Sequence, residues 1–315
     1  MDLLNRKNIV LLFSMFLIFA VMNAASFAKA NDLHILNGGY GNSYSHTNSA
    51  KINSILAANR EVGIFFSETQ SNYSENIKSR YGSDVEHGMM PGFGIKASDN
   101  FNIAGVNNLY ASISYRRTSG QTQYSDGGFY ESAGHNSNNI NAKFGKTFFM
   151  NSDMAATPYI FGGYRSWDRV VPNGVANPEH YSNEYVGLGG MFQYAPSNEL
   201  VLSANTGIAE VVGGHINADT QGLYRMTGGY LFPSSMSQSL ASRPYYTLGV
   251  GADYRVDKHL HLFSNLQYTD FMYGGSKMQT YYGTGPLTGY YGTLQEPSSQ
   301  TSNLNAEIGI AYSWG

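Results

Sequence analysis

The chain has 315 residues, a net charge of −3, no cysteine and only 13% charged side chains. This balance excludes the electrostatic attraction on which nucleic-acid binding depends, and it excludes a fold that relies on disulfide bonds. The 25 tyrosines, 17 phenylalanines and 36 glycines are typical of strands whose two faces meet lipid and a narrow polar interior.

Residues 1–30 have the layout of a cleaved secretory signal. A basic pair is followed by an apolar run over residues 9–22 and by small residues at Ala28 and Ala30. The apolar run is shorter than the roughly 20 residues that cross a bilayer as a helix, which disfavours a membrane anchor. We therefore expect export through the inner membrane with cleavage near Ala30.

Residues 31–58 lack the alternation of a strand and contain glycine-rich and weakly apolar stretches. We expect a flexible periplasmic leader, partly helical, that enters or caps the folded region that follows it. Two further strands are the alternative interpretation of this segment.

From residue 59 to 315, apolar and polar residues alternate repeatedly over long runs. The clearest run is 304–314, in which the even positions are apolar and the odd positions are polar or small. Side chains alternate between the two faces of a strand, so one face of this segment is apolar. Six apolar positions in register exceed the length of a typical sandwich strand and match the roughly 9–11 residues of a tilted membrane strand.

Ten segments carry this pattern, and they predict an all-β fold, a closed antiparallel up-and-down transmembrane β-barrel. Eight and twelve strands are the alternatives. The segments are centred on 62–66, 93–97, 109–115, 140–148, 157–169, 186–194, 200–208, 246–254, 260–268 and 304–314. In 157–169 the faces are ambiguous, because Tyr159, Ile160, Phe161 and Tyr164 occupy both parities.

The connections between these segments alternate between short and long. Short turns are expected at 150–153, 195–198 and 256–258, and a longer link at 98–108. Long surface loops are expected at 70–90, 117–137, 169–182, 213–243 and 273–301. Short periplasmic turns and long outer loops are typical of bacterial outer-membrane barrels, so we expect the cell outer membrane, with both ends of the barrel in the periplasm. A soluble sandwich gives no reason for this regular alternation.

Parity assigns several charged residues to the barrel interior. They are Arg116, Lys143, Asp253, Arg255 and Glu307. A ten-stranded barrel is nearly filled by side chains, and buried charges must be paired or solvated, so we expect a charge network that plugs the lumen. A gate in a narrow pore is the alternative. Aromatic residues at the ends of the outer face predict an interfacial girdle: Phe192, Tyr194, Tyr254, Tyr312 and Trp314.

The last predicted loop is rich in glycine and exposed tyrosine. Tyr281, Tyr282, Tyr290 and Tyr291 are typical either of a binding surface or of rings that pack over the barrel mouth. Acidic and histidine residues are scattered over the other predicted loops: Asp84, Glu86, His87, Asp126, His135, His215 and Asp219. They form no recognisable catalytic, metal or cofactor motif, so we expect no catalytic residues, no metal and no cofactor.

The signal, the segment from Pro158 to Tyr164 and the end from Ala306 to Tyr312 resemble small outer-membrane barrels of the OmpA/OmpX/opacity type over residues 59–315. The resemblance implies contact with outer-membrane lipid and lipopolysaccharide, and insertion by the barrel-assembly machinery. The chain departs from these families because it ends in Trp314-Gly315 rather than in a terminal Phe. No periplasmic peptidoglycan-binding domain follows, which removes a wall-anchoring role.

Three classes of function remain open. We favour a structural or surface-interaction protein, adhesin- or receptor-like, for which an extracellular ligand on the loops is the candidate partner. A narrow porin for small solutes is the first alternative. An omptin-like rim protease, or another outer-membrane hydrolase, is the second. Omptins have ten strands and Asp/His groups at the outer rim, but this chain lacks their acidic-pair motif.

Overall fold

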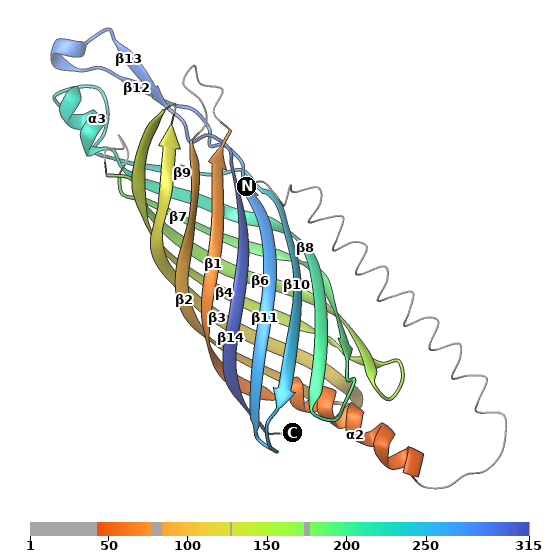
Figure 1. The fold of residues 1–315 in the computed structure, drawn as a ribbon. Helices are drawn as coiled ribbons and strands as arrows, with labels where there is room; N and C mark the ends of the chain where they lie inside the picture. Colours follow the sequence, from red (N-terminus) through yellow and green to blue (C-terminus); the bar gives the residue numbers. More distant parts are fainter. Residues whose placement is uncertain (1–42, 77–83, 127, 173–176, 315) are drawn as a thin grey trace.

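The computed structural model describes residues 43–76, 84–126, 128–172 and 177–314. The predicted signal at 1–30 and residues 31–42 of the predicted leader lie outside the described residues. A single sheet of twelve strands closes on itself, with ten barrel strands and two short additions (Figure 1). Every neighbouring pair is antiparallel, and β1 pairs with both β2 and β14. The predicted closed antiparallel barrel of ten strands is confirmed.

The barrel strands are β1 (Glu61–Glu75), β2 (Val85–Ile103), β3 (Val106–Asp126), β4 (Phe129–Lys146), β6 (Met154–Val170), β7 (Glu179–Tyr194), β8 (Leu200–Asp219), β10 (Arg243–Arg255), β11 (Leu260–Tyr273) and β14 (Ser299–Ser313). The short strands are β5 (Phe148–Phe149), which pairs with β6, β9 (Ser235–Ser239), which pairs with β8, and the hairpin β12 (Gln279–Tyr282) with β13 (Tyr291–Leu294). The helices are α2 (Ser43–Ala58), α3 (Gln221–Met226) and the 3₁₀ turn η1 (Gly285–Leu287).

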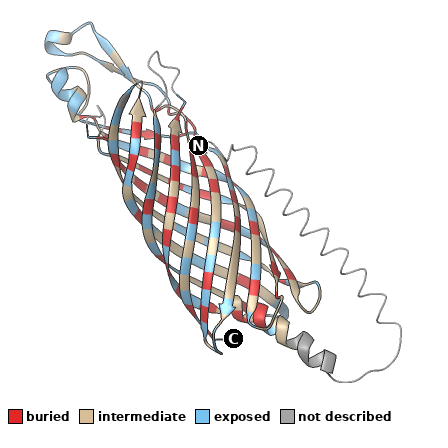
Figure 2. Cartoon of the chain, in the orientation of Figure 1, coloured by how far each residue is buried: buried red, intermediate tan, exposed pale blue. Residues whose placement is uncertain are grey.

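Alternate residues along each strand face outward and into the lumen (Figure 2). On β1, Phe66 is 75% exposed, whereas its neighbour Phe65 is only 5% exposed. The same alternation resolves the faces of β6: Tyr159 and Phe161 are buried in the interior, and Ile160 is exposed on the outside.

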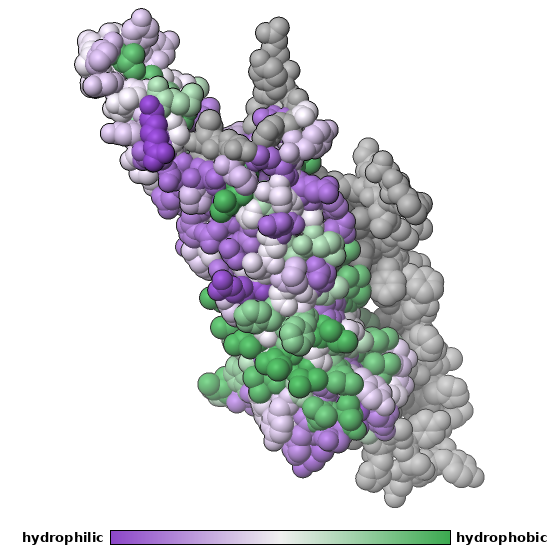
Figure 3. All heavy atoms as spheres, turned by 60° about the vertical axis from the view of Figure 1, so that its left-hand side comes forward, coloured by the Kyte–Doolittle hydropathy of each residue, from purple (hydrophilic) through white to green (hydrophobic). Residues whose placement is uncertain are grey.

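The exposed apolar residues form a belt around one part of the barrel. Its members are Val62, Ile64, Phe66, Phe93, Ile95, Ile113, Ile140, Phe144, Ile160, Val186, Leu188, Ile208, Leu262, Ile308 and Ile310. In the space-filling view the belt appears as a hydrophobic band with a largely polar wall above it (Figure 3). A closed barrel with such a band satisfies its backbone hydrogen bonds internally and exposes apolar side chains to lipid, as a bilayer requires.

The strands continue far beyond this belt, and this corrects the predicted loops. β3 has 21 residues and β8 has 20, about twice the roughly 9–11 that cross a bilayer. The predicted loop 117–137 is strand over most of its length, and only residues 127–128 connect β3 to β4. The prediction was wrong because the projecting wall is polar on its outer face, so it loses the apolar alternation while it keeps its ladder of hydrogen bonds.

The end of the barrel that carries the shorter turns also carries α2 and the end of β14 (Figure 1). We call it the periplasmic end, because short turns lie there in bacterial barrels. The predicted longer link at 98–108 is wrong: β2 and β3 are joined at Ala104 and Gly105, which have φ angles of 50° and 81°. Glycine tolerates this left-handed conformation, and the tight turn therefore needs no longer connection.

Helix α2 is docked against the periplasmic end of the barrel. Its Ile55 is 0% exposed and packs against small apolar side chains of the barrel turns. Ser54 Oγ donates a hydrogen bond to the carbonyl oxygen of Asn198 at 2.6 Å. Just after the helix, the side-chain amides of Asn59 and Gln193 exchange two hydrogen bonds of 2.9 Å. Among the described residues, no helix is both long and apolar enough to cross a bilayer.

Candidate functional site

The outer half of the lumen holds a group of ionisable residues around Arg169, which we call the outer network. Its members are Glu75, Asp84, Glu86, His135, Arg169, Glu179 and Glu296, and most of them are buried. They come from five barrel strands and two outer connections. Glu75 lies nine residues beyond Phe66 along β1, so the network is outside the membrane-crossing part of the barrel.

Arg169 is the centre of the outer network. Its Nη1 donates to Glu179 Oε2 at 2.7 Å and lies 3.4 Å from Glu75 Oε1, and its Nε donates to Glu86 Oε1. The side chain is 4% exposed, so these ion pairs are shielded from solvent. A buried guanidinium is tolerable only with such partners, because an unpaired buried charge is costly.

His135 extends the network from Glu86 to Trp167. The Trp167 Nε1–H donates to His135 Nδ1 at 2.8 Å. An indole nitrogen can only donate, so Nδ1 is an acceptor in this contact. The ring proton is therefore on Nε2, which faces Glu86 Oε2 at 2.7 Å. In this tautomer His135 is neutral, and Arg169 is the counter-charge for the surrounding carboxylates.

The carboxylates of the network differ in their affinity for protons. Burial raises the pKa of Glu75 to about 7 and that of Glu296 to about 8. Burial would also raise the pKa of Glu86, but the hydrogen bond from His135 and the charge of Arg169 outweigh it and lower this pKa to about 2. Glu86 is thus the firmly ionised partner of Arg169, whereas Glu75 and Glu296 hold their protons near neutral pH.

Aromatic rings fill the lumen beside the network, in a row that we call the ring stack. Trp167 stacks on His135 with centroids 5.5 Å apart and on Tyr181 at 4.9 Å, and Tyr181 stacks on Tyr273 at 5.7 Å. Tyr181 donates its hydroxyl to Glu296 Oε1 at 2.7 Å. The connection that follows β13 is thereby attached to the side chains of the lumen.

A cavity of about 240 Å³ lies in the lumen and is lined mainly by polar side chains. Arg116, Lys143, Asp253 and Glu307, four of the predicted lumen charges, line it. They do not form one network. Arg116 Nη1 donates to Glu307 Oε1 at 2.8 Å, and Lys143 Nζ lies 5.0 Å from the ring centroid of Tyr159.

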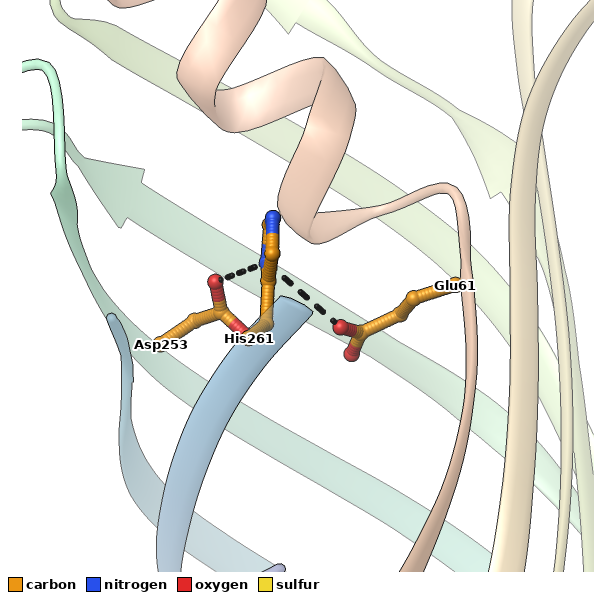
Figure 4. Close-up of side chains that lie close together, drawn as sticks. All are labelled: Glu61, Asp253 and His261. Atoms are coloured by element: carbon orange, nitrogen blue, oxygen red, sulfur yellow. Dashed lines mark hydrogen bonds and ion pairs between the residues drawn. The ribbon is translucent and has the colours of Figure 1, made fainter. Parts of the chain in front are cut away.

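Asp253 belongs to a separate group at the periplasmic end, which we call the periplasmic cluster: Glu61, Asp253 and His261 (Figure 4). His261 Nδ1 lies 2.7 Å from Asp253 Oδ1 and 3.8 Å from Glu61 Oε2. Arg255, the fifth predicted lumen charge, is half-buried at the end of β10 and lies outside the lining of the cavity. Carboxylates and an imidazole are donors that a metal ion accepts.

The predicted aromatic residues lie on outward-facing positions. Tyr254, Tyr312 and Trp314 are 50%, 54% and 46% exposed at the periplasmic end of the belt. Phe192 and Tyr194 are half-buried on the outer face of β7.

The four tyrosines of the last predicted loop lie on the β12–β13 hairpin. Tyr282, Tyr290 and Tyr291 are 76%, 65% and 71% exposed. Tyr281 instead packs edge-on against Phe232 with centroids 6.0 Å apart. Three of the four tyrosines are therefore free to meet a ligand, and the fourth holds the hairpin against the neighbouring outer segment.

The scattered loop residues divide into three groups. Asp84, Glu86 and His135 meet in the outer network. Two others face outward: His87 is exposed and bonded to Asn72, and His215 is bonded to Ser237. Asp126 is half-buried at the end of β3, and Asp219 accepts a hydrogen bond from the backbone of Gln221.

Sequence reasoning missed Arg169, the residue that organises the network. The signal was present in the parity of β6, where Arg165 and Arg169 share the inward positions of Phe161 and Trp167. The ambiguous faces of that strand hid it. Glu75, Glu179 and Glu296 carried no comparable signal, because they are distant in sequence and meet only when the barrel closes.

Several solved outer-membrane proteins are similar to the chain at low identity. The outer membrane protease OmpT from Escherichia coli matches 81% of this chain and 95% of its own, with 10% identity and a TM-score of 0.49. Ail, the attachment invasion locus protein of Yersinia pestis, matches 80% and 97% with 10% identity and a TM-score of 0.29. OprG from Pseudomonas aeruginosa matches 81% and 97% with 11% identity and a TM-score of 0.32.

No protein-family model matches the sequence, and no curated protein is similar to it. Sequence identities and TM-scores as low as these assign no activity to the chain. The closed ten-stranded wall and its continuous apolar belt, by contrast, are properties of the chain itself. On these grounds the chain is an outer-membrane β-barrel protein.

Proposed function

We propose that the protein is a non-conducting barrel that presents its outer extension to an extracellular ligand, as an adhesin- or receptor-like surface protein. The observation that carries this proposal is the packing of buried aromatic rings inside the barrel, next to a projecting surface that exposes tyrosines. Because packed side chains fill much of the interior of the barrel, the side chains that can contact a ligand lie on its outer surface.

The packed lumen supports the first half of the proposal. Beyond the ring stack, Tyr185 and Tyr245 stack with centroids 4.7 Å apart, and Phe161 and Phe271 pack around them. At the other end, the last turns of α2 pack against the barrel at its periplasmic mouth. A porin needs a continuous aqueous path, and among the described residues these rings and α2 occupy parts of the lumen around the cavity.

The projecting surface supports the second half. The β12–β13 hairpin and α3 extend beyond the rim of the barrel (Figure 1). They expose Tyr282, Tyr290, Tyr291 and also Met226, which is 76% exposed. Tyrosine supplies a large contact area and a hydrogen-bonding hydroxyl at a small entropic cost, which suits recognition of proteins and glycans.

A hydrolase receives less support from the same geometry. The pair of Asp168 with His180, 2.6 Å apart, lies on the outer face of the wall and not in the lumen. The pair of Glu86 with His135 is 1% and 3% exposed at its side chains. A general base must reach the proton that it abstracts, and these groups are covered by Thr122, Trp167 and Arg169.

Adherence of surface-displayed protein tests the proposal. A laboratory bacterium displaying the barrel is applied to wells coated with fibronectin, laminin, collagen or mucin, and bound cells are counted. We expect adherence above the level of cells without the barrel on at least one coat. The variant with Tyr282→Ser, Tyr290→Ser and Tyr291→Ser should lose most of it.

The matched control is Tyr130→Ser, because Tyr130 is 78% exposed but belongs to the start of β4 and not to the β12–β13 hairpin. Its adherence should equal that of the unchanged protein. Purified protein in planar bilayers should give no single-channel current. Steady current steps, or adherence no higher than that of cells without the barrel on every coat, would overturn the proposal.

A further inference from the structure

The periplasmic cluster brings three metal-binding side chains together from distant parts of the chain. Glu61 is the first residue of β1, Asp253 lies on β10 and His261 lies on β11. One potential ligand atom from each lies within 4.8 Å of the others. Figure 4 shows both carboxylates turned toward the same ring nitrogen, Nδ1 of His261, below the end of α2.

The cluster also contains buried polar atoms that lack a partner. Glu61 Oε2, Asp253 Oδ2 and His261 Nε2 are inaccessible to solvent and make no hydrogen bond. Glu61 and His261 are 2% and 1% exposed. Buried polar groups are nearly always satisfied, because an unsatisfied one costs free energy. Glu61 Oε2 points toward Nδ1 at 3.8 Å, too far for a hydrogen bond, so a ligand between them would satisfy it.

The spacing of the donor atoms fits one small cation. Two donors bound at about 2.1 Å to the same ion, at angles of about 90–110°, are about 3.0–3.4 Å apart. The two distances from Nδ1, 2.7 Å and 3.8 Å, lie on either side of this range. Small side-chain rotations therefore suffice, and the backbone need not move.

We propose that Glu61, Asp253 and His261 bind one divalent transition-metal ion at the periplasmic end of the lumen. Two carboxylates and one imidazole suit Zn²⁺, Mn²⁺ or Fe²⁺ better than Ca²⁺, which takes six to eight oxygen ligands. Glu61 and Asp253 line the lumen cavity, so water from the cavity can complete the coordination sphere.

Lys96 sets the charge of this site. Its Nζ lies 2.6 Å from Glu61 Oε1, the oxygen that faces away from the cluster, and 3.3 Å from the ring centroid of Phe263. The lysine thus occupies one oxygen of Glu61 and leaves the other to the ion. Its positive charge opposes a cation, so removal of this charge should strengthen metal binding.

Metal binding would join β1, β10 and β11 where α2 meets the barrel. Glu61 follows Asn59, whose side chain is bonded to Gln193, by only two residues. An ion on Glu61 therefore holds the connection between helix and barrel. A metal ion on Nδ1 replaces the hydrogen bond between His261 Nδ1 and Asp253, and the ring proton then lies on Nε2.

Titration of the chelator-treated, refolded full-length protein with Zn²⁺ or Co²⁺ tests the site. Calorimetry should give one ion per chain, and bound Co²⁺ should give the visible absorption of nitrogen and oxygen coordination. Asp253→Asn and His261→Asn should each weaken binding by about tenfold or more, since each removes a direct ligand. Lys96→Met should tighten binding, an effect that a merely structural lysine would not produce.

His259→Asn is the matched control, because His259 lies at the same end but bonds to the backbone of Ser313 and stacks on Tyr312. It should bind as the unchanged protein does. Heat-modifiable gel migration reports whether each variant is folded. If the His261→Asn variant does not fold, the near-isosteric Asp253→Asn variant tests the site in its place. The proposal would be overturned if the unchanged protein bound no metal ion, or if Asp253→Asn and Lys96→Met bound the ion with equal affinity.

Discussion

The guanidinium of Arg169 on β6 contacts the carboxylate of Glu86 on β2 across the interior of the barrel. Around the wall these two strands are separated by β3 and β4, so the contact is a direct bridge through the lumen. Glu179 on β7 and Glu75 on β1 bind the same guanidinium. This half of the barrel projects beyond the membrane, and the bridge holds its wall together from within.

The first prediction concerns this bridge. Arg169→Met should destabilise the barrel by about 3–5 kcal/mol, because it leaves buried carboxylates without their counter-charge. The loss is measured as the shift in urea-induced unfolding of the protein in detergent micelles. Trp167 serves as the fluorescent reporter, since it stacks on His135 inside the network.

Arg117→Met is the control for this prediction. Arg117 lies on the exposed face of β3, so its replacement should change the free energy of unfolding by less than about 1 kcal/mol. If both variants unfolded at the same urea concentration as the unchanged protein, Arg169 would not support the wall.

The second prediction is a decline in stability between pH 5 and pH 8. Glu75 and Glu296 have folded-state pKa values of about 7 and about 8, above the ordinary value of 4.5. Between these values the unfolded chain loses protons that the folded protein keeps, so rising pH favours unfolding. Glu86 acts in the opposite direction: its pKa of about 2 lies below 4.5, so its contribution is lost as the pH falls toward 2.

Unfolding midpoints across pH 3–9 measure this profile, and the maximum should lie near pH 5. Glu296→Gln should flatten the decline between pH 5 and pH 8, because the amide stays neutral and keeps a hydrogen bond to Tyr181. Glu199→Gln, at an exposed periplasmic turn, should leave the profile unchanged. A decline that is equally steep in Glu296→Gln would show that this carboxyl is not responsible.

The membrane-crossing part of the fold could be predicted because lipid imposes a strict pattern. Ile308 and Ile310 face the bilayer, and Gly309 between them faces the lumen. That constraint ends at the rim of the belt. Beyond it, Gln121 and Thr122 lie on opposite faces of the same strand, yet both are polar, so hydropathy no longer distinguishes the strand from a loop.

The interior contacts could not be predicted for a different reason. Glu61, Asp253 and His261 each carry an unremarkable local sequence, and their proximity depends on the closure of β14 onto β1. The partnership of Glu86 with Arg169 depends in addition on which face of β6 is inside. These are properties of register and closure, and a single sequence does not contain them as a motif.

The third prediction concerns the docking of α2. Ile55→Asp should detach the helix, because it places a charge in a site that is 0% exposed. Lys51 and Arg60 then become accessible to trypsin, and the rate of cleavage after them should rise about tenfold or more. Asn53→Asp introduces the same charge on the exposed side of the helix and should be cleaved like the unchanged protein. Equal rates in both variants would mean that Ile55 does not hold the helix.

The fourth prediction is that the lumen has two independent closures. Tyr185 and Tyr245 stack almost parallel, at 4°, and line the cavity, while α2 packs at its periplasmic end. Tyr181 and Tyr273 of the ring stack belong to the same upper closure. Replacement of Tyr181, Tyr185, Tyr245 and Tyr273 by Ala opens only this closure, so the four-ring variant alone should carry no current in planar bilayers. Its combination with Ile55→Asp should produce single-channel steps. The control is Tyr246→Ala, which removes an exposed ring that faces lipid. Combined with Ile55→Asp in place of the ring substitutions, it should give no current. Because a path must be open along its whole length to conduct, current from either lesion alone would contradict the two closures.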